Sequence, residues 1–214
     1  MRKVVCLLAF FVPALLLASS VRAQQPKVYI GAGAGSSNAS FNSSDFNFGA
    51  PLTEDKSSMG FKGFAGIRFN DYISAEIGYV DLGKFSVKIN GGGIGAAQLD
   101  YKVSGVALSG IGSFPVGQDF SLFARVGAFA SSTKLTLANA SGIIGANLAA
   151  AGITPGSHDT ADTTTLLYGA GAQYNFTDHL SARLEYENFG EVGNSDDTGR
   201  AKVSLISASL LYRF

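Results

Sequence analysis

A strict alternation of apolar residues with polar or small ones is the feature that most constrains the fold of this chain. In the stretch ISAEIGY (73–79), every second residue is apolar, and serine, glutamate and glycine lie between them. A period of two residues places alternate side chains on opposite faces of a β-strand. The pattern therefore predicts an all-β fold. The alternation marks eight segments, at 27–35, 61–69, 73–79, 101–114, 120–133, 164–176, 180–189 and 202–214.

The lengths of these segments and of their connections predict how the strands are arranged. Many segments have about 10 to 15 residues, which is long for a water-soluble strand and typical of a tilted strand that crosses a bilayer. A closed barrel leaves no unpaired strand edge in lipid. We therefore predict an eight-stranded antiparallel transmembrane up-and-down β-barrel with both termini and all short turns on the periplasmic side. Four long connections, at 36–58, 84–100, 134–163 and 190–200, alternate with three short turns, at 70–71, 115–119 and 177–178.

The first 23 residues have the order of a secretory signal peptide. A basic start is followed by an apolar run of about 15 residues and a small-residue end at Ala23, and that run is shorter than the roughly 20 residues of a membrane-spanning helix. We therefore expect a signal peptide at 1–23 and a barrel domain at 24–214. Cleavage removes the single cysteine, Cys6, together with three basic residues and no acidic one, so that 13 basic residues face 16 acidic ones. This balance argues against nucleic acid as a partner.

Aromatic residues cluster at both ends of the predicted strands, as they do in the two interfacial girdles of outer-membrane barrels. We expect one girdle near the short turns and one near the long connections. The first contains Phe69, Tyr72, Phe114, Phe120, Phe176, Tyr212 and Phe214. The second contains Tyr79, Phe85, Tyr101, Tyr168, Tyr186 and Phe189.

The strand face opposite to lipid carries the charged side chains. A charge that faces hydrocarbon at the bilayer midplane costs about 2–4 kcal/mol, and an eight-stranded barrel has an interior that side chains nearly fill. We therefore expect these groups to pair inside the barrel, Glu76 with Arg183 or Arg125 and Glu185 with Arg68 or Arg125. The candidate interior network consists of Lys62, Arg68, Glu76, Arg125, Gln173, Arg183 and Glu185.

A second set of basic residues lies near the long connections. Phosphorylated lipopolysaccharide of the outer leaflet is a natural partner for such side chains, although solvated loop charge explains them equally well. The candidate lipopolysaccharide contacts are Lys84, Lys88, Lys102, Lys134 and Lys202.

No motif in the chain indicates an enzyme, a cofactor or a metal site. The stretch GAGAGSS (31–37) is rich in glycine, but no helix pattern follows it, as a nucleotide-binding loop would require. The two histidines, His158 and His179, fall at opposite ends of the predicted barrel, so they are not expected to form a dyad. The apolar stretch IIGANLAAAGI (143–153) is expected either to cap the barrel mouth or to offer a sticky patch to a partner.

Three long stretches resemble one known family. GFKGFAGIRFNDYISAEIGYVDLG (60–83), YKVSGVALSGIGSFPVGQDFSLFARVG (101–127) and YGAGAQYNFTDHLSARLEYENFG (168–190), with the terminal YRF, resemble the transmembrane domain of outer membrane protein A and its eight-stranded relatives. The resemblance covers essentially the whole mature chain and implies the same barrel. Larger members carry a periplasmic peptidoglycan-binding domain after the barrel, and we expect this chain, which ends at Phe214, to lack it.

The resemblance also implies roles for individual residues. It implies that Glu76 and Arg183 form a salt bridge that plugs the lumen, and that a lysine–glutamate pair of the family is replaced here by Ile111 and Gln173. It further implies that the terminal residues Leu210, Tyr212 and Phe214 are read by the barrel-assembly machinery.

These observations predict an integral protein of the Gram-negative outer membrane with a role in membrane integrity and in adhesion or recognition through its long loops. Outer-membrane lipids, the assembly machinery and host or cell surfaces are the expected partners. The alternative is a narrow porin-like channel with a charged lumen. A soluble ligand-binding barrel is a third reading, which would place the apolar residues inside.

Overall fold

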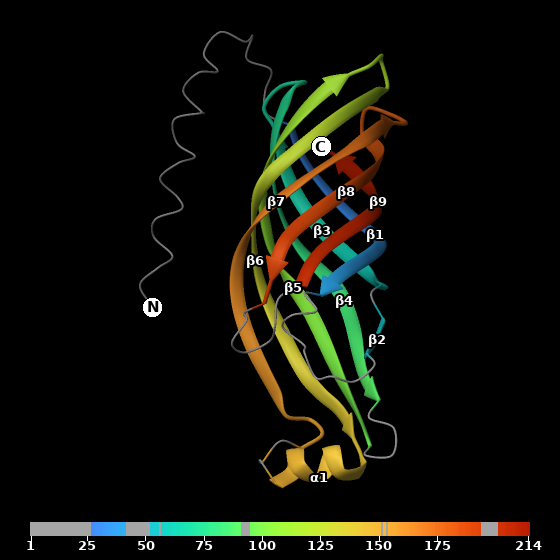
Figure 1. The fold of residues 1–214 in the computed structure, drawn as a ribbon. Coiled ribbons are helices and arrows are strands. Elements are labelled where there is room, and N and C mark those ends of the chain that lie inside the picture. The colour runs from blue at the N-terminus through green and yellow to red at the C-terminus, as the bar shows by residue number, and fades with distance from the viewer. Residues whose placement is uncertain are drawn as a thin grey trace, which may run out of the picture.

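The computed structural model is a closed barrel in which each strand pairs with its neighbours in an antiparallel sense (Figure 1). The structure describes residues 27–41, 52–55, 57–90, 95–150, 152, 154–193 and 201–214. The predicted signal peptide at 1–23 lies outside these residues. The barrel strands are β1 (Lys27–Phe41), β3 (Ser57–Arg68), β4 (Ile73–Asn90), β5 (Ala96–Pro115), β6 (Phe120–Ala140), β7 (His158–Asn175), β8 (Leu180–Val192) and β9 (Ala201–Arg213).

The strand order shows how the ring closes. Along the sheet the order is β4-β3-β1-β9-β8-β7-β6-β5, and β5 pairs with β4 to complete the ring. The first and last strands therefore meet, from Tyr29 opposite Arg213 to Phe41 opposite Ala201. The seam is tight, because a Cβ on Gly35 would overlap the carbonyl of Ile206. The predicted eight-stranded up-and-down barrel is confirmed, and each predicted segment lies in one of these strands to within one residue at the short-turn end.

A short extra strand, β2 (Leu52–Asp55), pairs with β4 beyond the end of the β3–β4 ladder. Between these two pairings β4 contains an irregularity from Asp81 to Lys84. Gly83 has a φ of 83°, which is the left-handed region that side chains disfavour. The irregularity inserts one extra residue into the alternation. Leu82 and Phe85 both point inward as a result, and Lys84 points outward.

The strands continue well beyond the predicted segments at the long-connection end. The chain was expected to form connections at 84–100 and 134–163, but β4 and β5 pair as far as Asn90 and Ala96, and β6 and β7 as far as Thr136 and His158. In Figure 1 these extensions reach down to the helix α1 (Gly142–Ala150). No helix within the described ranges is long and apolar enough to cross a membrane.

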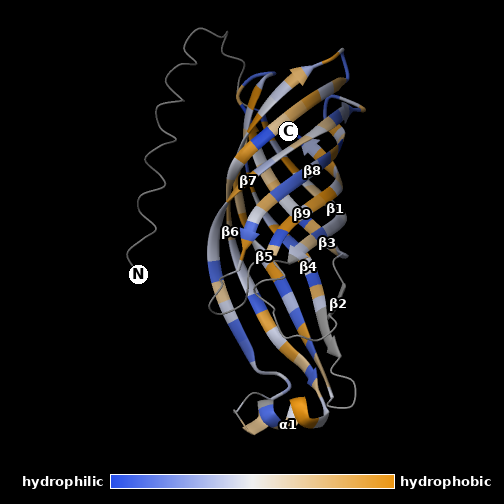
Figure 2. Ribbon diagram, in the orientation of Figure 1, coloured by the Kyte–Doolittle hydropathy of each residue, from blue (hydrophilic) through white to orange (hydrophobic). Residues whose placement is uncertain are grey.

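The outer wall carries a broad belt of exposed apolar side chains. Figure 2 shows the apolar positions alternating with polar ones along the strands in the upper part of the barrel. All seven aromatic residues predicted near the short turns are exposed on this wall. At the other end, Tyr79, Tyr168 and Tyr186 are exposed as predicted, and Phe61 joins them. The prediction was wrong for Phe85, Tyr101 and Phe189, which are at most 1% exposed. They lie inside the barrel because they fall on the inward phase of their strands.

Candidate functional site

Glu76 lies at the centre of the barrel interior and bridges two arginines. From β4 its carboxylate lies 2.5 Å from a terminal nitrogen of Arg125 on β6 and 2.5 Å from one of Arg183 on β8. The Tyr29 hydroxyl donates to the same carboxylate at 2.8 Å. Glu76 is 3% exposed. Both partners anticipated for Glu76 therefore contact it at once, and neither is an alternative to the other.

Lys62 extends this cluster from β3, the strand that pairs with β4. Its Nζ contacts the carboxylate of Glu185 and lies 2.7 Å from that of Glu187, both on β8. Arg125 joins the two parts, because its guanidinium lies 2.7 Å from Glu187 and 3.2 Å from Glu185. Three cations and three carboxylates thus form one continuous network. It is neutral as a whole, as a buried set of charges must be to avoid a large desolvation cost.

Of the expected members of the network, Arg68 lies outside it and Gln173 lies at its edge. Arg68 does not contact Glu185, because it lies at the short-turn rim and pairs with Asp71 at 3.2 Å. Gln173 lies at the edge of the network, where its side-chain oxygen accepts from Arg183 at 3.2 Å. Ile111, at the other position aligned with the family's second pair, is buried. The lysine–glutamate contact of this barrel is instead made by Lys62.

Sequence reasoning missed Glu187, although a signal for it was present. Glu187 is fully buried and contacts both Lys62 and Arg125. It follows Arg183 and Glu185 at intervals of two, so strict alternation along β8 places it on the inner face. Without Glu187 the network would carry a net positive charge.

An apolar cluster fills the lumen between the network and the long-connection end. Phe129 and Phe189 pack edge to face with ring centroids 4.8 Å apart. The Tyr101 hydroxyl donates to the carbonyl of Val192 across the lumen. The barrel interior therefore has a charged layer and an apolar layer in series. The apolar layer is formed by Val80, Leu82, Phe85, Tyr101, Val103, Phe129, Leu167, Phe189, Val192, Val203 and Leu205, together with small residues.

Three of the predicted surface lysines form a row across neighbouring strands. Lys84 is directly opposite Lys102, and Lys102 is directly opposite Lys134. Lys84 lies 2.9 Å from Asp100, and Lys102 lies 3.2 Å from Asp81. Within the described part of the chain, Lys134 has no carboxylate at ion-pair distance. Like charges directly opposite one another destabilise a sheet, so the row suggests a partner outside the protein.

The carboxylate of Asp100 remains charged beside this row. Burial alone would raise the pKa of Asp100, but hydrogen bonds from Lys84, Gln98 and Ser86 outweigh that effect and hold the pKa below its usual value. Lys84 thus has a neutralising partner within the protein, whereas no carboxylate of the described residues pairs with Lys134. Lys202, on β9, is exposed and lies 3.6 Å from Glu191. The side chain of Lys88 lies outside the described part of the structure.

Comparison with known proteins decides the family. The family model of the OmpA-like transmembrane domain matches residues 23–214, which is almost the whole chain. The chain belongs to this family. As an OmpA-like barrel, it lies in the outer membrane of a Gram-negative bacterium, with its apolar belt toward lipid and its short turns toward the periplasm.

The sequence identity between this chain and individual relatives is low. The OmpA-like barrel is 31% identical over 162 residues to outer membrane protein A of Yersinia pseudotuberculosis, covering 74% of this chain and 41% of that protein. It is 27% identical over 173 residues to outer membrane protein A of Escherichia coli O157:H7, covering 78% of this chain and 42% of that protein. The chain thus spans about two fifths of the length of these relatives.

Solved structures support the same fold at low sequence identity. Neisserial surface protein A matches with a TM-score of 0.56 and 17% identity, covering 89% of this chain and 100% of that one. Ail of Yersinia pestis, solved in complex with the heparin analogue sucrose octasulfate, matches with a TM-score of 0.52 and 19% identity, with the same coverage. OprG of Pseudomonas aeruginosa matches with a TM-score of 0.51 and 15% identity, covering 90% and 97%.

The remaining candidate residues of the OmpA-like barrel lie at its two rims. Leu210, Tyr212 and Phe214 are exposed on the lipid-facing wall at the periplasmic end. The backbone N–H of Phe214 donates to the carbonyl of Val28 at 3.1 Å, which extends the seam. His158 begins β7 on the extracellular side, whereas His179 lies in the periplasmic turn before β8.

Proposed function

We propose that this OmpA-like barrel is a closed, non-conducting and non-enzymatic outer-membrane protein that supports the membrane and presents an extracellular surface for contact with other surfaces. The observation that carries the proposal is the filled lumen. The charged and apolar layers lie in series, and the cavity beside Lys62, Glu76 and Arg125 measures about 10 Å³, which is room for about one water molecule. A porin-like channel would need a continuous water path through both layers.

The extracellular projection supports the surface role. β4, β5, β6 and β7 continue beyond the aromatic residues of the outer wall as a sheet of mixed polar and apolar positions, and α1 lies at its end (Figures 1 and 2). Ile143 of α1 is 59% exposed. α1 packs on the ends of β5 and β6, so we assign it to the projecting surface. We assign the closure of the lumen to the apolar layer. Ail, the attachment invasion locus protein, has the same fold and was solved in complex with a heparin analogue, which supports a surface role for such a barrel.

Deletion of residues 142–150 tests both halves of this proposal. We expect cells that carry the deletion to lose attachment to host-cell or heparin-coated surfaces by several-fold, because the projecting tip is removed. Bilayer recordings of the purified protein should show no conductance above baseline before or after the deletion, because the lumen layers remain. Conductance steps in the unmodified protein would contradict a closed barrel, and unchanged attachment would contradict a surface role for the tip.

We further propose that the lysine row binds the phosphates of lipopolysaccharide. On β4 the row begins at Lys84, which lies beyond the exposed Tyr79 toward the extracellular end of the barrel. A lysine near an anionic membrane surface contributes about 1 kcal/mol. Reversal of Lys102 and Lys134 to glutamate should therefore reduce co-purified lipopolysaccharide at least about fivefold. Lys27→Glu is the matched control at the periplasmic end, and an equal loss in this control would contradict the assignment.

We also propose that Phe214 is a recognition signal for the barrel-assembly machinery. Its ring is 65% exposed and contacts Tyr212, while its backbone hydrogen bond to Val28 does not need the ring. Phe214→Ala should therefore lower the assembled fraction in cells several-fold, as measured by heat-modifiable gel migration. Refolding of the purified variant in detergent should be unchanged. Phe176→Ala, at the same rim, is the control, and equal assembly of the two variants would contradict recognition.

A further inference from the structure

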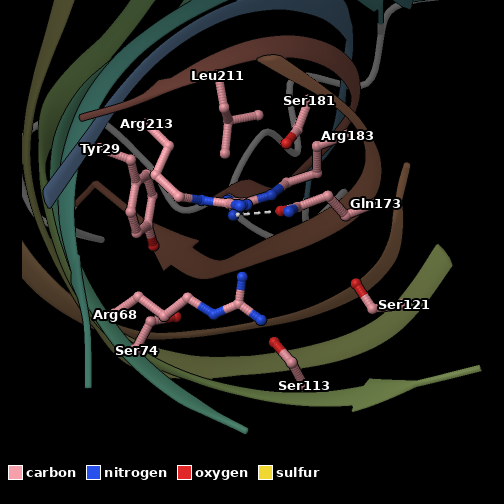
Figure 3. A pocket seen from close by; sticks show the side chains of 10 residues that line it. All are labelled: Tyr29, Arg68, Ser74, Ser113, Ser121, Gln173, Ser181, Arg183, Leu211 and Arg213. Carbon is pink, nitrogen blue, oxygen red and sulfur yellow. Dashed lines mark hydrogen bonds between the residues drawn. The ribbon is translucent and has the colours of Figure 1, made fainter. Parts of the chain in front are cut away.

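The periplasmic end of the lumen contains an open cavity of about 30 Å³ between the charged network and the short turns. We call it the periplasmic vestibule. Every one of the eight barrel strands contributes to its wall, and Figure 3 shows side chains reaching into it from several sides. A cavity needs roughly 10–15 Å³ of such volume to hold one water, so the vestibule has room for about two waters or for a small ion that replaces them. Its lining consists of Tyr29, Arg68, Ser74, Ser113, Ser121, Gln173, Ser181, Arg183, Leu211 and Arg213.

The charge of this lining is positive. It includes the three arginines Arg68, Arg183 and Arg213 and contains no carboxylate. Arg183 is balanced by Glu76. Arg68 pairs with Asp71, whose side chain is 57% exposed to solvent on the turn, so that pair is largely screened.

Arg213 has no carboxylate side chain at ion-pair distance among the described residues. Its guanidinium donates to two neutral oxygens, the carbonyl of Asp178 and Oδ1 of Asn175, each at 3.3 Å. These are long contacts for a guanidinium group. The vestibule therefore holds an excess of positive charge, whereas the neighbouring network is neutral.

Buried donors make the vestibule more than a group of surface cations. Arg183 is 5% exposed, and its Nε has no hydrogen-bond partner. The hydroxyl groups of Ser113 and Ser121 reach toward the cavity from β5 and β6, opposite Arg183 and Arg213, while Arg68 lies on the same side as Ser113 (Figure 3). Guanidinium forks and hydroxyl groups are the donors that bind tetrahedral oxyanions.

We propose that the periplasmic vestibule binds an oxyanion of the phosphate class, with Arg213 and Arg68 as the charged donors and Ser113 and Ser121 as neutral donors. A bound oxyanion would offset the charge of Arg213, for which the described residues place no carboxylate side chain at ion-pair distance. The oxyanion is either soluble, as inorganic phosphate or a phosphomonoester, or the phosphate of a phospholipid headgroup at the inner-leaflet rim.

Calorimetric titration of the full chain in lipid-free detergent at low ionic strength tests this inference. One arm adds inorganic phosphate and the other adds dihexanoyl-phosphatidylglycerol below its micelle concentration. We expect saturable binding of one ligand per barrel in at least one arm. Arg213→Gln should weaken it about tenfold or more, because a hydrogen bond to a charged group contributes roughly 1.5–3 kcal/mol. The Ser113→Ala, Ser121→Ala double variant, which keeps every charge, should weaken it several-fold.

Lys202→Gln is the matched control, since it removes the same charge at the opposite end of β9 and should leave binding unchanged. Saturation with phosphate alone assigns the site to a soluble ion, and saturation with the lipid alone assigns it to a headgroup. Absence of saturable binding in both arms overturns the proposal. Equal weakening by Arg213→Gln and Lys202→Gln also overturns it, because the effect would then reflect net charge alone.

Discussion

Replacement of Glu76 by glutamine is expected to lower the free energy of unfolding of the barrel by about 3–5 kcal/mol. Glu76 faces both Arg125 and Arg183 at 2.5 Å. Its neutralisation leaves two buried guanidinium groups with a net charge that the low-dielectric interior cannot screen. Urea unfolding of the protein in detergent micelles or lipid vesicles measures this loss. The effect is large because one residue serves two partners.

A double variant separates the network from simple loss of packing. If Glu76 and Arg183 act as a pair, Glu76→Gln combined with Arg183→Gln should cost less than the sum of the single changes, by about 0.5–3 kcal/mol. Lys202→Gln, which disrupts an exposed pair, should cost at most about 1 kcal/mol. Strict additivity of the two interior substitutions would show that the charges do not interact as the structure indicates.

Replacement of Phe129 by alanine should lower the free energy of unfolding by about 3–5 kcal/mol through the apolar layer instead. The ring of Phe129 is fully buried and packs on Phe189. Its removal leaves a cavity inside a wall of hydrogen-bonded strands, which cannot collapse to fill it. Urea unfolding again measures the change.

The Phe129→Ala variant also separates stability from closure of the lumen. The charged layer remains intact in this variant, so bilayer recordings should still show no conductance. Phe61→Ala, on the lipid-facing wall, is the matched control and should cost less because its ring is 54% exposed. A loss below about 1 kcal/mol for Phe129→Ala would contradict a tightly packed apolar layer.

The barrel itself could be predicted because the membrane imposes a two-residue period on the strands. Where both faces of a strand have a clear character, as from Ser74 to Tyr79, the phase of each side chain was correct. The network contacts of Glu76 followed from the same rule. The sequence limited the partner of Glu76 to Arg183 or Arg125 but could not choose between them, because one sequence does not show the register between strands.

The apolar layer was missed for two physical reasons. Near the extracellular end both faces of the strands carry aromatic and aliphatic residues. The alternation of apolar and polar residues therefore does not distinguish the lipid-facing side from the lumen-facing side there. In β4 the extra residue at Gly83 also reverses the phase, which turns Phe85 inward. Tyr101 and Phe189 do follow the inward phase of their strands. Strict alternation favoured the lumen for them, but the expectation of an aromatic girdle overrode it.

The long extensions of β5, β6 and β7 were missed because no lipid contacts them. Outside the membrane the outward face is polar, so stretches such as His158–Thr165 lack the alternation that marks a spanning strand. Backbone pairing between β6 and β7 maintains the strands there. The lysine row became visible only through this pairing, since Lys84, Lys102 and Lys134 are far apart along the chain.

The span of the charge network along the chain has a consequence for how the barrel forms. Glu76 and Arg183 are separated by 107 residues, and Lys62 and Glu187 by 125. A partly inserted sheet that contained only β1 to β4 would bring Lys62 and Glu76 into the bilayer without Arg125, Arg183 or Glu187. Such an intermediate would leave charges unpaired in hydrocarbon. We therefore expect insertion and ring closure to be coupled into one late, cooperative step, which is slow because distant parts of the chain must meet.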